Sequence, residues 1–379
     1  MQSYLLVLGN TPELSLAEIS ALVHDQVPEI WSNHLAEIKL ENDEQAQQLQ
    51  QLLGGVFKII KVVCELDSDS ILAHQQIVDF LFGKSNKVTF GITNLAQSEL
   101  VISDSQLKRL LKDGGQKARF RQGSQWGLSA AITQHEPTVF DLFVIKHDDK
   151  FYLAQAIAAQ NLDEWIAKDR KKPYVAGKKG MLPPKLARIM VNLGLGSLSQ
   201  SIKNPVLYDP FCGTGTVLIE GLLRGCKVIG SDLDKDAVAG SLENLYWLED
   251  YFQQQFKYQV FKSDVASAAQ QDWKTKVDLI VTEPFLGKPR SDPNELDNIF
   301  KGLTSMYLGA FKEWSKILNN GATVTIVFPT TVTSKKSYNL MSLIDKLASY
   351  GYTLQVNPIN YARKKAVIVR QILVFKYKQ

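Results

Sequence analysis

The sequence predicts an α/β protein whose C-terminal half is built on a parallel sheet, preceded by an N-terminal α+β half. The first observation is Val206–Asp209, an apolar run that ends in an acid and is followed by a glycine-rich turn and an apolar helical segment. The second is that three later apolar runs also end at acids. Open parallel sheets bind ligands at the carboxyl ends of their strands, so these acids predict one binding edge.

Composition is that of an ordinary globular protein, and 379 residues predict two or three domains. The net charge of +4 permits a nucleic-acid partner without requiring one. Three scattered cysteines without a C-x-x-C pair favour a reducing compartment over disulfides or a cysteine zinc site. With neither a signal peptide nor a membrane-length apolar run, we expect a cytoplasmic protein. All five histidines precede residue 150, which excludes a histidine base or histidine-ligated metal from the second half.

Residues 1–66 are predicted to form a ferredoxin-like domain. A buried strand over residues 3–9 is followed by a helix with Pro12 at its first position. Strands are expected at 35–40 and 56–66, with a helix between them. This order fits a split β-α-β unit, although another small domain would give a similar pattern.

Residues 67–160 are predicted to form a second α+β domain that carries a basic cluster. The cluster consists of Lys108, Arg109, Lys112, Lys117, Arg119 and Arg121. Such a cluster neutralises phosphates and gives affinity for nucleic acid independent of its sequence, but a solvated helix face has the same pattern. The segment resembles a THUMP domain, the RNA-binding module of several tRNA-modifying enzymes, most closely over residues 117–131.

Residues 161–180 are predicted to be a basic linker, and residues 181–379 the C-terminal domain. A helix opened by prolines follows Met181. Beyond the strand-end acids, the expected elements are a helix over 302–318, a strand over 322–328, a helix over 337–350 and a strand over 367–377.

The turn after the first acid-ended strand predicts a nucleoside site. Gly213 and Gly215 let a ligand approach the backbone because they have no Cβ and tolerate positive φ. Asp232, at the end of the next strand, suits the hydroxyls of a ribose. The third glycine of a dinucleotide fingerprint is Leu218 here, and Asp209 would repel a pyrophosphate, so a dehydrogenase is disfavoured.

The same acids favour S-adenosylmethionine as the cofactor. Asp209 suits its cationic sulfonium and amino group, and Asp264, at the end of a third strand, suits its adenine amine. A fourth strand ends in Glu283-Pro284-Phe285-Leu286-Gly287. The predicted cofactor-binding residues are Asp209, Gly213, Gly215, Asp232, Leu233 and Asp264.

Four ordered strand ends of this kind resemble those of a class I methyltransferase, which implies a Rossmann-like, seven-stranded sheet. In the family, the motif after the fourth strand is Asp-Pro-Pro-Tyr, whose acid and proline carbonyl accept hydrogen bonds from an amine while the ring stacks on the base. Here Glu283 replaces the aspartate, Phe285 the second proline and Leu286 the tyrosine. The resemblance implies Glu283, Pro284 and Phe285 as catalytic residues, without a metal.

The residues over 165–173 and 181–193 resemble the join between domains in THUMP-containing tRNA guanine-N2 methyltransferases. This resemblance covers nearly the whole chain, and it implies methyl transfer to the exocyclic N2 amine of a guanosine in tRNA, of the guanosine-10 type. The predicted RNA-binding residues are Arg109, Lys117, Arg119, Arg121, Arg170, Lys171 and Lys172.

Two alternatives remain open from the sequence. The altered motif at Glu283 is also expected of a non-catalytic RNA-binding protein, or of one that depends on a protein activator subunit. An amino-methyltransferase that acts on DNA would have a related motif, but the THUMP-like half argues against it. Cys212 beside the turn has no partner base, so we expect it to pack rather than to act as a nucleophile.

Overall fold

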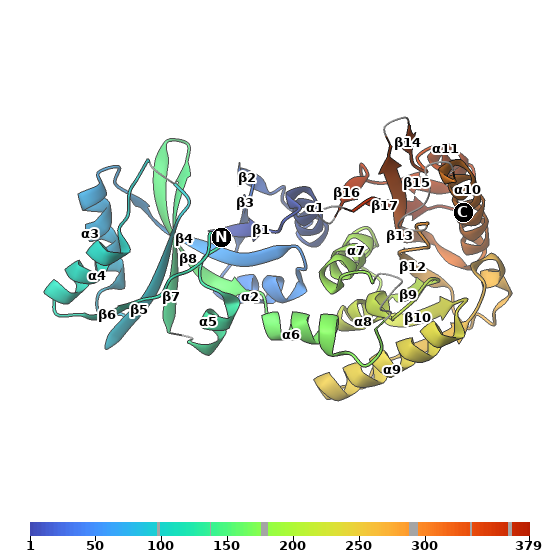
Figure 1. The fold of residues 1–379 in the computed structure, drawn as a ribbon, viewed down its shortest axis with the longest axis horizontal. Helices are drawn as coiled ribbons and strands as arrows, with labels where there is room; N and C mark the ends of the chain where they lie inside the picture. The colour runs from blue at the N-terminus through green and yellow to red at the C-terminus, as the bar shows by residue number, and fades with distance from the viewer. Residues whose placement is uncertain (97–98, 137, 176–180, 288–294, 334–335, 363–365) are drawn as a thin grey trace. The chain divides into compact units, whose positions relative to one another are not determined.

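The computed structural model describes residues 1–379 except 97–98, 137, 176–180, 288–294, 334–335 and 363–365. The described residues form two compact units, one made of residues 1–16 and 25–164 and the other of residues 17–24 and 165–379. Each contains a sheet with helices, so the predicted α/β class is confirmed (Figure 1).

The first unit is built on an eight-stranded sheet in the order β2-β3-β1-β4-β8-β7-β5-β6. Its strands are β1 (Gln2–Leu8), β2 (Glu29–Ser32), β3 (Leu35–Leu40), β4 (Val56–Leu66), β5 (Lys87–Asn94), β6 (Lys117–Phe120), β7 (Val139–His147) and β8 (Lys150–Ala159). Its helices are α2 (Asp43–Leu52), α3 (Ser70–Leu81), α4 (Asp104–Asp113) and α5 (Ala130–His135), and α1 (Pro12–Leu22) begins in this unit and ends in the other.

One continuous sheet crosses the boundary predicted at residue 66. Strand β4 pairs antiparallel with β8, from Lys58 opposite Ala159 to Leu66 opposite Phe151. Strands from both predicted N-terminal domains therefore share backbone hydrogen bonds within one compact unit. The division of this half into two domains stays a prediction.

The second unit contains a nine-stranded sheet. Its main path is β11-β10-β9-β12-β13-β17-β15, with β14 paired to β13 and β16 to β17. The strands are β9 (Val206–Asp209), β10 (Lys227–Asp232), β11 (Tyr258–Lys262), β12 (Val277–Thr282), β13 (Leu318–Val332), β14 (Ser337–Tyr338), β15 (Tyr352–Leu354), β16 (Ile359–Tyr361) and β17 (Val369–Tyr377). The helices are α6 (Leu162–Ile166), which begins in the first unit, the π-helix η1 (Ala167–Lys171), α7 (Pro184–Gly196), α8 (Thr216–Leu223), α9 (Lys235–Phe252), the 3-10 helix η2 (Val265–Gln270), α10 (Leu296–Ile317) and α11 (Leu343–Ala348).

The seven strands of the main path match the predicted number, and β14 and β16 are additional short strands. Strands β11, β10, β9, β12 and β13 run parallel, whereas β17 is antiparallel to both of its neighbours, β13 and β15. The predicted carboxyl-end acids at Asp209, Asp232, Asp264 and Glu283 therefore lie along one edge of the sheet.

The helix predicted over residues 337–350 is wrong in its first half. Ser337 and Tyr338 form β14 against the end of β13, and the buried Tyr338 ring packs 5.4 Å from that of Phe300. Only Leu343–Ala348 is helical. The apolar spacing of Leu340, Leu343 and Leu347 is satisfied by a turn and a short helix, and the strand pairing of Tyr338 overrides the helical pattern.

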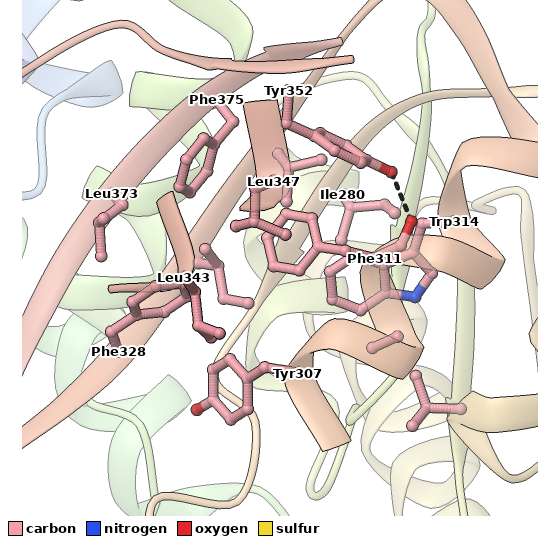
Figure 2. Close-up of a cluster of buried hydrophobic side chains, with 14 of the residues drawn as sticks. Ile280, Tyr307, Phe311, Trp314, Phe328, Leu343, Leu347, Tyr352, Leu373 and Phe375 are labelled. Carbon is pink, nitrogen blue, oxygen red and sulfur yellow. Dashed lines mark hydrogen bonds between the residues drawn. The ribbon is translucent and has the colours of Figure 1, made fainter. Parts of the chain in front are cut away.

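Alternate residues of the central strands face opposite layers of helices. A Cβ on Gly194 of α7 would contact Leu279 and Val281, whereas Ile280 between them belongs to the core formed with α10 and α11. Figure 2 shows that core, in which the Tyr352 hydroxyl donates to the Phe311 carbonyl at 2.9 Å. Burial on both faces explains why these strands are apolar throughout.

No helix of the described residues is long and apolar enough to cross a membrane. Within the same residues there is no group of three or more histidine, cysteine, aspartate or glutamate side chains placed to hold a metal ion.

Candidate active site

Two glycines shape the turn between β9 and α8. Gly213 and Gly215 have φ angles of +52° and +74°, a left-handed conformation that residues with a Cβ rarely adopt. A Cβ on Gly213 would approach only the Phe211 carbonyl oxygen, at 3.9 Å, so the backbone borders open space. Gly215 is the N-cap of α8 and supplies no side-chain cap, which leaves first-turn amides of this helix for a ligand.

Asp232 binds the turn from the end of β10. Its Oδ2 accepts a hydrogen bond from the Gly213 amide at 3.0 Å, and its Oδ1 accepts one from the Asp234 amide at 2.9 Å. These bonds fix the carboxylate beside the turn, where the sequence predicts a ribose. Leu233, the next residue, is 64% exposed and presents an apolar side chain at the same strand end.

Asp264 follows β11 and serves as the N-cap of η2. Its Oδ1 accepts from the Ala266 amide at 2.9 Å, and the residue is exposed. The cap orients the carboxylate at the third strand end. Its predicted contact with an adenine amine stays a prediction.

Asp209 is buried beneath the turn. Its Oδ1 accepts from the Thr282 hydroxyl at 2.7 Å and from the Phe211 amide at 3.1 Å. Burial, together with the negative charges of Asp232 and Glu283, raises the pKa of Asp209 to about 7, although the two hydrogen bonds oppose the shift. Without a cation nearby, this carboxyl group is thus poised to hold or release a proton near neutral pH.

Glu283 follows β12 and is bound by Arg370 of β17. Arg370 donates from Nε to Oε1 and from Nη2 to Oε2, the latter at 3.3 Å. The pair is therefore bidentate, and the side chains of Arg370 and Glu283 are only 16% and 15% exposed. The predicted catalytic acid thus has a fixed cationic partner that the sequence did not indicate.

The residues after Glu283 differ in exposure. Pro284 is buried, whereas Phe285 is 56% exposed and offers its ring to a planar ligand. The buried Tyr307 hydroxyl donates to the Val327 carbonyl at 3.2 Å and lies 3.5 Å from the Phe285 carbonyl. Tyr307 thereby links the motif to α10 and β13.

Cys212 lies within the turn and is inert. It is buried, and burial with the charge of Asp209 raises the pKa of its thiol well above the usual range. Its Sγ lies 3.6 Å from the Ser241 hydroxyl. This environment supports the expected packing role, because the thiolate needed for a nucleophile is disfavoured.

The segment predicted as a basic linker is largely packed against the second unit, and residues 176–180 lie outside the described ones. Lys172 is 4% exposed, and its Nζ donates to the hydroxyls of Thr214 and Thr216 at 3.2 and 3.0 Å. Burial lowers the pKa of Lys172 to about 8. The prediction that Lys172 faces RNA is therefore wrong, because its ammonium group lies under the cofactor turn. Arg170 and Lys171 are exposed, and their RNA contacts stay predictions.

A buried ionic cluster holds the same segment to α8. Glu220 is fully buried and lies 3.1 Å from Lys168 Nζ and 2.6 Å from Arg188 Nε. The Lys168 ammonium also sits 3.7 Å from the ring centroid of Trp165. A lysine within a predicted linker is thus part of the folded core.

The remaining predicted RNA-binding residues lie in the first unit. Lys117 and Arg119 alternate with two half-buried residues along β6 and are both exposed, so they share one face. Arg109 is exposed on α4, whereas Arg121 pairs with Glu136. The structure therefore leaves Lys117, Arg119 and Arg109 open to solvent and shows Arg121 in part neutralised.

A basic surface pocket of about 540 Å³ adjoins these residues. It is lined by Lys87, Lys112, Gly115, Gln116, Lys117 and Ala118. Lys87 and Lys117 are brought together because they are register partners in the parallel pair β5 and β6. The pocket thus concentrates three lysines from separate elements.

Two comparisons of the sequence point to methyltransferases. A family model described as RMKL-like, methyltransferase domain (UPF0020), matches residues 173–346. A protein of Methanothermococcus thermolithotrophicus named "Probable tRNA (guanine(10)-N2)-dimethyltransferase" is 42% identical over 121 residues, 31% of this chain and 70% of that protein. The chain belongs to the tRNA (guanine-N2)-methyltransferase family.

Two further comparisons are with a curated relative and with a solved structure. The tRNA (guanine(10)-N2)-dimethyltransferase of Methanothermobacter thermautotrophicus is 36% identical over 151 residues, 39% of this chain and 40% of the relative. The chain thus matches less than half the length of that curated relative. The crystal structure of TrmN from Thermus thermophilus is similar in fold over 99% of both chains, with a TM-score of 0.55 and 14% identity.

In the present protein, the turn between β9 and α8 fits S-adenosylmethionine. The open backbone at Gly213 admits a ligand, the oriented Asp232 carboxylate can accept from ribose hydroxyls, and exposed Leu233 can cover an adenine. The buried acid Asp209 supplies negative charge for the sulfonium and ammonium groups. When bound, the cofactor would supply an electrophilic methyl group.

Below about pH 7, binding of S-adenosylmethionine to the present protein should release a proton from Asp209. The sulfonium favours the ionised form of Asp209, whose pKa without a ligand is about 7. Affinity for S-adenosylmethionine should therefore rise with pH and level off above about 7. The stability of the unliganded fold has the opposite dependence on pH. The pKa of Asp209 is about 7 in the folded protein and 3.8 for an ordinary aspartate, so the protonated carboxyl group favours the folded state. The stability that Asp209 contributes is therefore fully present below pH 3.8 and is lost as pH rises through 7.

Calorimetry at pH 6 in buffers of different ionisation enthalpy checks the proton release. The binding enthalpy should vary with the buffer for the wild type and not for Asp209→Asn. Equal enthalpies in all buffers for the wild type would contradict the coupling.

The residues that hold the predicted site residues in place were not identified from the sequence. Thr282 precedes Glu283 and carries a hydroxyl on a buried strand, which is a weak local signal. Arg370 lies 87 positions from Glu283 and has no local signal. Asn244 donates to the Thr214 carbonyl at 2.8 Å and to the Tyr174 carbonyl at 2.9 Å, and only the folded chain brings these groups together.

Proposed function

We propose that this protein transfers a methyl group from S-adenosylmethionine to the exocyclic N2 amine of a guanosine in tRNA, of the guanosine-10 type. The observation that carries the proposal is the position of Glu283: it follows β12, the neighbour of the strand β9 that leads into the glycine turn, within the part of the chain that matches the family model. The curated relatives are named for this reaction.

The exocyclic amine of guanine is a poor nucleophile because its lone pair is delocalised into the ring. Glu283 accepts a hydrogen bond from an amine N–H, which orients the nitrogen toward the methyl carbon and favours its lone pair. The exposed Phe285 ring stacks on the base. As the nitrogen–carbon bond would form and the carbon–sulfur bond break, the sulfur would keep the electron pair of the broken bond and leave as the thioether of S-adenosylhomocysteine. The Glu283 carboxylate would stabilise the positive charge that develops on the nitrogen and accept the proton that the nitrogen loses.

We propose that the N-terminal half is a THUMP-type module that captures the tRNA, and that the protein acts in the cytoplasm. The exposed Lys117 and Arg119, with the pocket that also contains Lys87 and Lys112, supply cations for phosphates. Turning the guanine out of its stack costs a few kcal/mol, so affinity from this half should matter to turnover.

Transfer of labelled methyl groups to unmodified tRNA transcripts, followed by digestion to nucleosides, tests the function. We expect label in N2-methylguanosine. If the chain binds the cofactor but labels no nucleoside, the stand-alone enzyme is excluded, and the non-catalytic alternative or one that needs a protein activator replaces it.

Charge reversal in the first unit should weaken tRNA binding. In the variant with Lys117→Glu and Arg119→Glu, we expect a large loss of affinity, because two cations on one face become anions. The slope of log affinity against log salt should fall by about 0.7 to 0.9 for each phosphate contact removed. Binding titrations at several salt concentrations measure both effects.

Lys203→Glu is the matched control, because Lys203 is exposed in the loop that precedes β9 in the second unit. It should leave both the affinity and the slope near those of the wild type. S-adenosylmethionine should bind all variants equally. Loss of tRNA and cofactor binding together would indicate misfolding, and an unchanged salt slope in the double variant would contradict the assignment.

A further inference from the structure

We propose that Arg370 is a positioning residue for methyl transfer: it holds the Glu283 carboxylate in the orientation that receives the target amine. The inference rests on the proposed function and goes beyond it, because Arg370 lies outside the motif and outside the part that matches the family model.

The sheet register brings Arg370 to Glu283 from two strands away. Arg370 is opposite Pro329 of β13, and β13 lies between β17 and β12, the strand that leads into Glu283. Neighbouring strands are about 4.8 Å apart, so the two backbones are separated by roughly 10 Å. The long side chains of arginine and glutamate span that distance over the end of β13.

The geometry of the pair leaves room for a substrate. An ionised carboxylate has about four acceptor sites, and the two bonds from Arg370 use one site on each oxygen. The remaining sites can accept from an amine. Because guanidinium is planar and binds both oxygens, it fixes the plane of the carboxylate as well as its position.

The acids near Glu283 make this cation necessary. Asp209 is buried, and the charges of Asp232 and Glu283 raise its pKa. The buried Tyr307 phenol also faces Glu283, and burial together with that charge raises its pKa. Arg370 is the cation that directly contacts Glu283 among the described residues. Without it, three carboxylates would share one strand edge, and Glu283 would lose the cation that orients its two oxygens.

The pair also accounts for glutamate where the family motif has aspartate. Glutamate has one more rotatable bond, so an unsupported carboxylate would sample more orientations. Arg370 removes that freedom, and the extra methylene gives Glu283 the reach to meet it. Pre-organisation of the acid is thus supplied by a distant strand.

Four variants test the inference: Arg370→Gln, Arg370→Lys, Glu283→Gln, and Arg370→Gln combined with Glu283→Gln. We expect Arg370→Gln to lower kcat by about 10²-fold, as misplacement of a catalytic group does, with KM for tRNA and the affinity for S-adenosylmethionine within about twofold of the wild type. Arg370→Lys should recover part of kcat. The double variant should be no slower than Glu283→Gln, because Arg370 acts through Glu283.

Chemical rescue separates positioning from a structural role. For Arg370→Gln, added guanidinium at low millimolar concentration should restore part of kcat. Lys376→Gln, a charge removal on the same strand with its side chain bound to the Ser197 carbonyl, should keep the wild-type kcat and should not respond to guanidinium. An unchanged kcat in Arg370→Gln, or a rise in KM for tRNA alone, would overturn the inference.

Guanosine binding in the presence of S-adenosylhomocysteine gives a readout without turnover. We expect the wild type and Arg370→Lys to bind and Arg370→Gln to bind more weakly. If the wild type methylates no tRNA, the proposed function fails, and the inference then stands only if this pattern of guanosine binding is found. If the wild type methylates tRNA and Arg370→Gln matches it, the inference alone fails.

Discussion

Glu283→Gln should lower kcat for methyl transfer to tRNA by about 10²- to 10³-fold. The amide keeps the volume of the side chain but loses the negative charge that stabilises the developing cation on the guanine nitrogen. It also loses one of the two acceptors for the bidentate pair with Arg370. Affinity for S-adenosylmethionine should stay within about twofold or rise slightly, because a charge that raises the pKa of Asp209 is removed.

Single-turnover methylation of tRNA, with cofactor affinity measured separately, checks this expectation. Glu243→Gln is the matched control, because Glu243 is an exposed residue of α9 and undergoes the same chemical change. Glu283→Asp is informative as well: it restores the acid of the family motif but shortens the reach to Arg370, so we expect intermediate activity. Full activity of Glu283→Gln would rule out Glu283 as the catalytic carboxylate.

Glu220→Gln should destabilise the second unit by about 3 to 5 kcal/mol, the cost of breaking a buried ion pair from one side. Glu220 is fully buried between Lys168 and Arg188, whose side chains are 1% and 4% exposed. A neutral amide would remove the carboxylate that both buried cations contact. The effect should appear as a lower midpoint of thermal unfolding.

Glu243→Gln again provides the comparison, because an exposed substitution on a neighbouring helix should shift the midpoint little. Bound S-adenosylmethionine should recover only part of the loss, through ordinary ligand stabilisation. If Glu220→Gln unfolds at the wild-type temperature, the two cations must find other partners, and the cluster does not hold this segment.

The cofactor side of the site could be predicted from sequence because its signals are local. Asp209, Gly213 and Gly215 lie within seven residues of one strand-turn-helix segment. Glycine at positive φ and acids after apolar runs both have physical causes that act within a few residues. Six strands of the main path of the C-terminal sheet could be predicted for the same reason, since each was marked by an apolar run, whereas the short strand β15 was not predicted.

The charged partners could not be predicted because they depend on tertiary contacts. Lys172 was interpreted as an RNA contact from its basic surroundings, yet it donates to Thr214 and Thr216, more than forty positions away. Arg370 reaches Glu283 only through the strand register. A charge in a basic run is usually solvated, and nothing within the run distinguishes the lysine that is buried.

The contacts of Lys168, Lys172 and Tyr174 change where the catalytic half can be separated from the rest of the chain. A fragment that begins at residue 181 would lack one cation of the Glu220 cluster, the ammonium under Thr214 and Thr216, and the backbone that Asn244 binds. The turn between β9 and α8 would lose these contacts. We therefore expect a stable methyltransferase fragment to begin at or before Trp165, because the polypeptide that enters this half is part of its folded core.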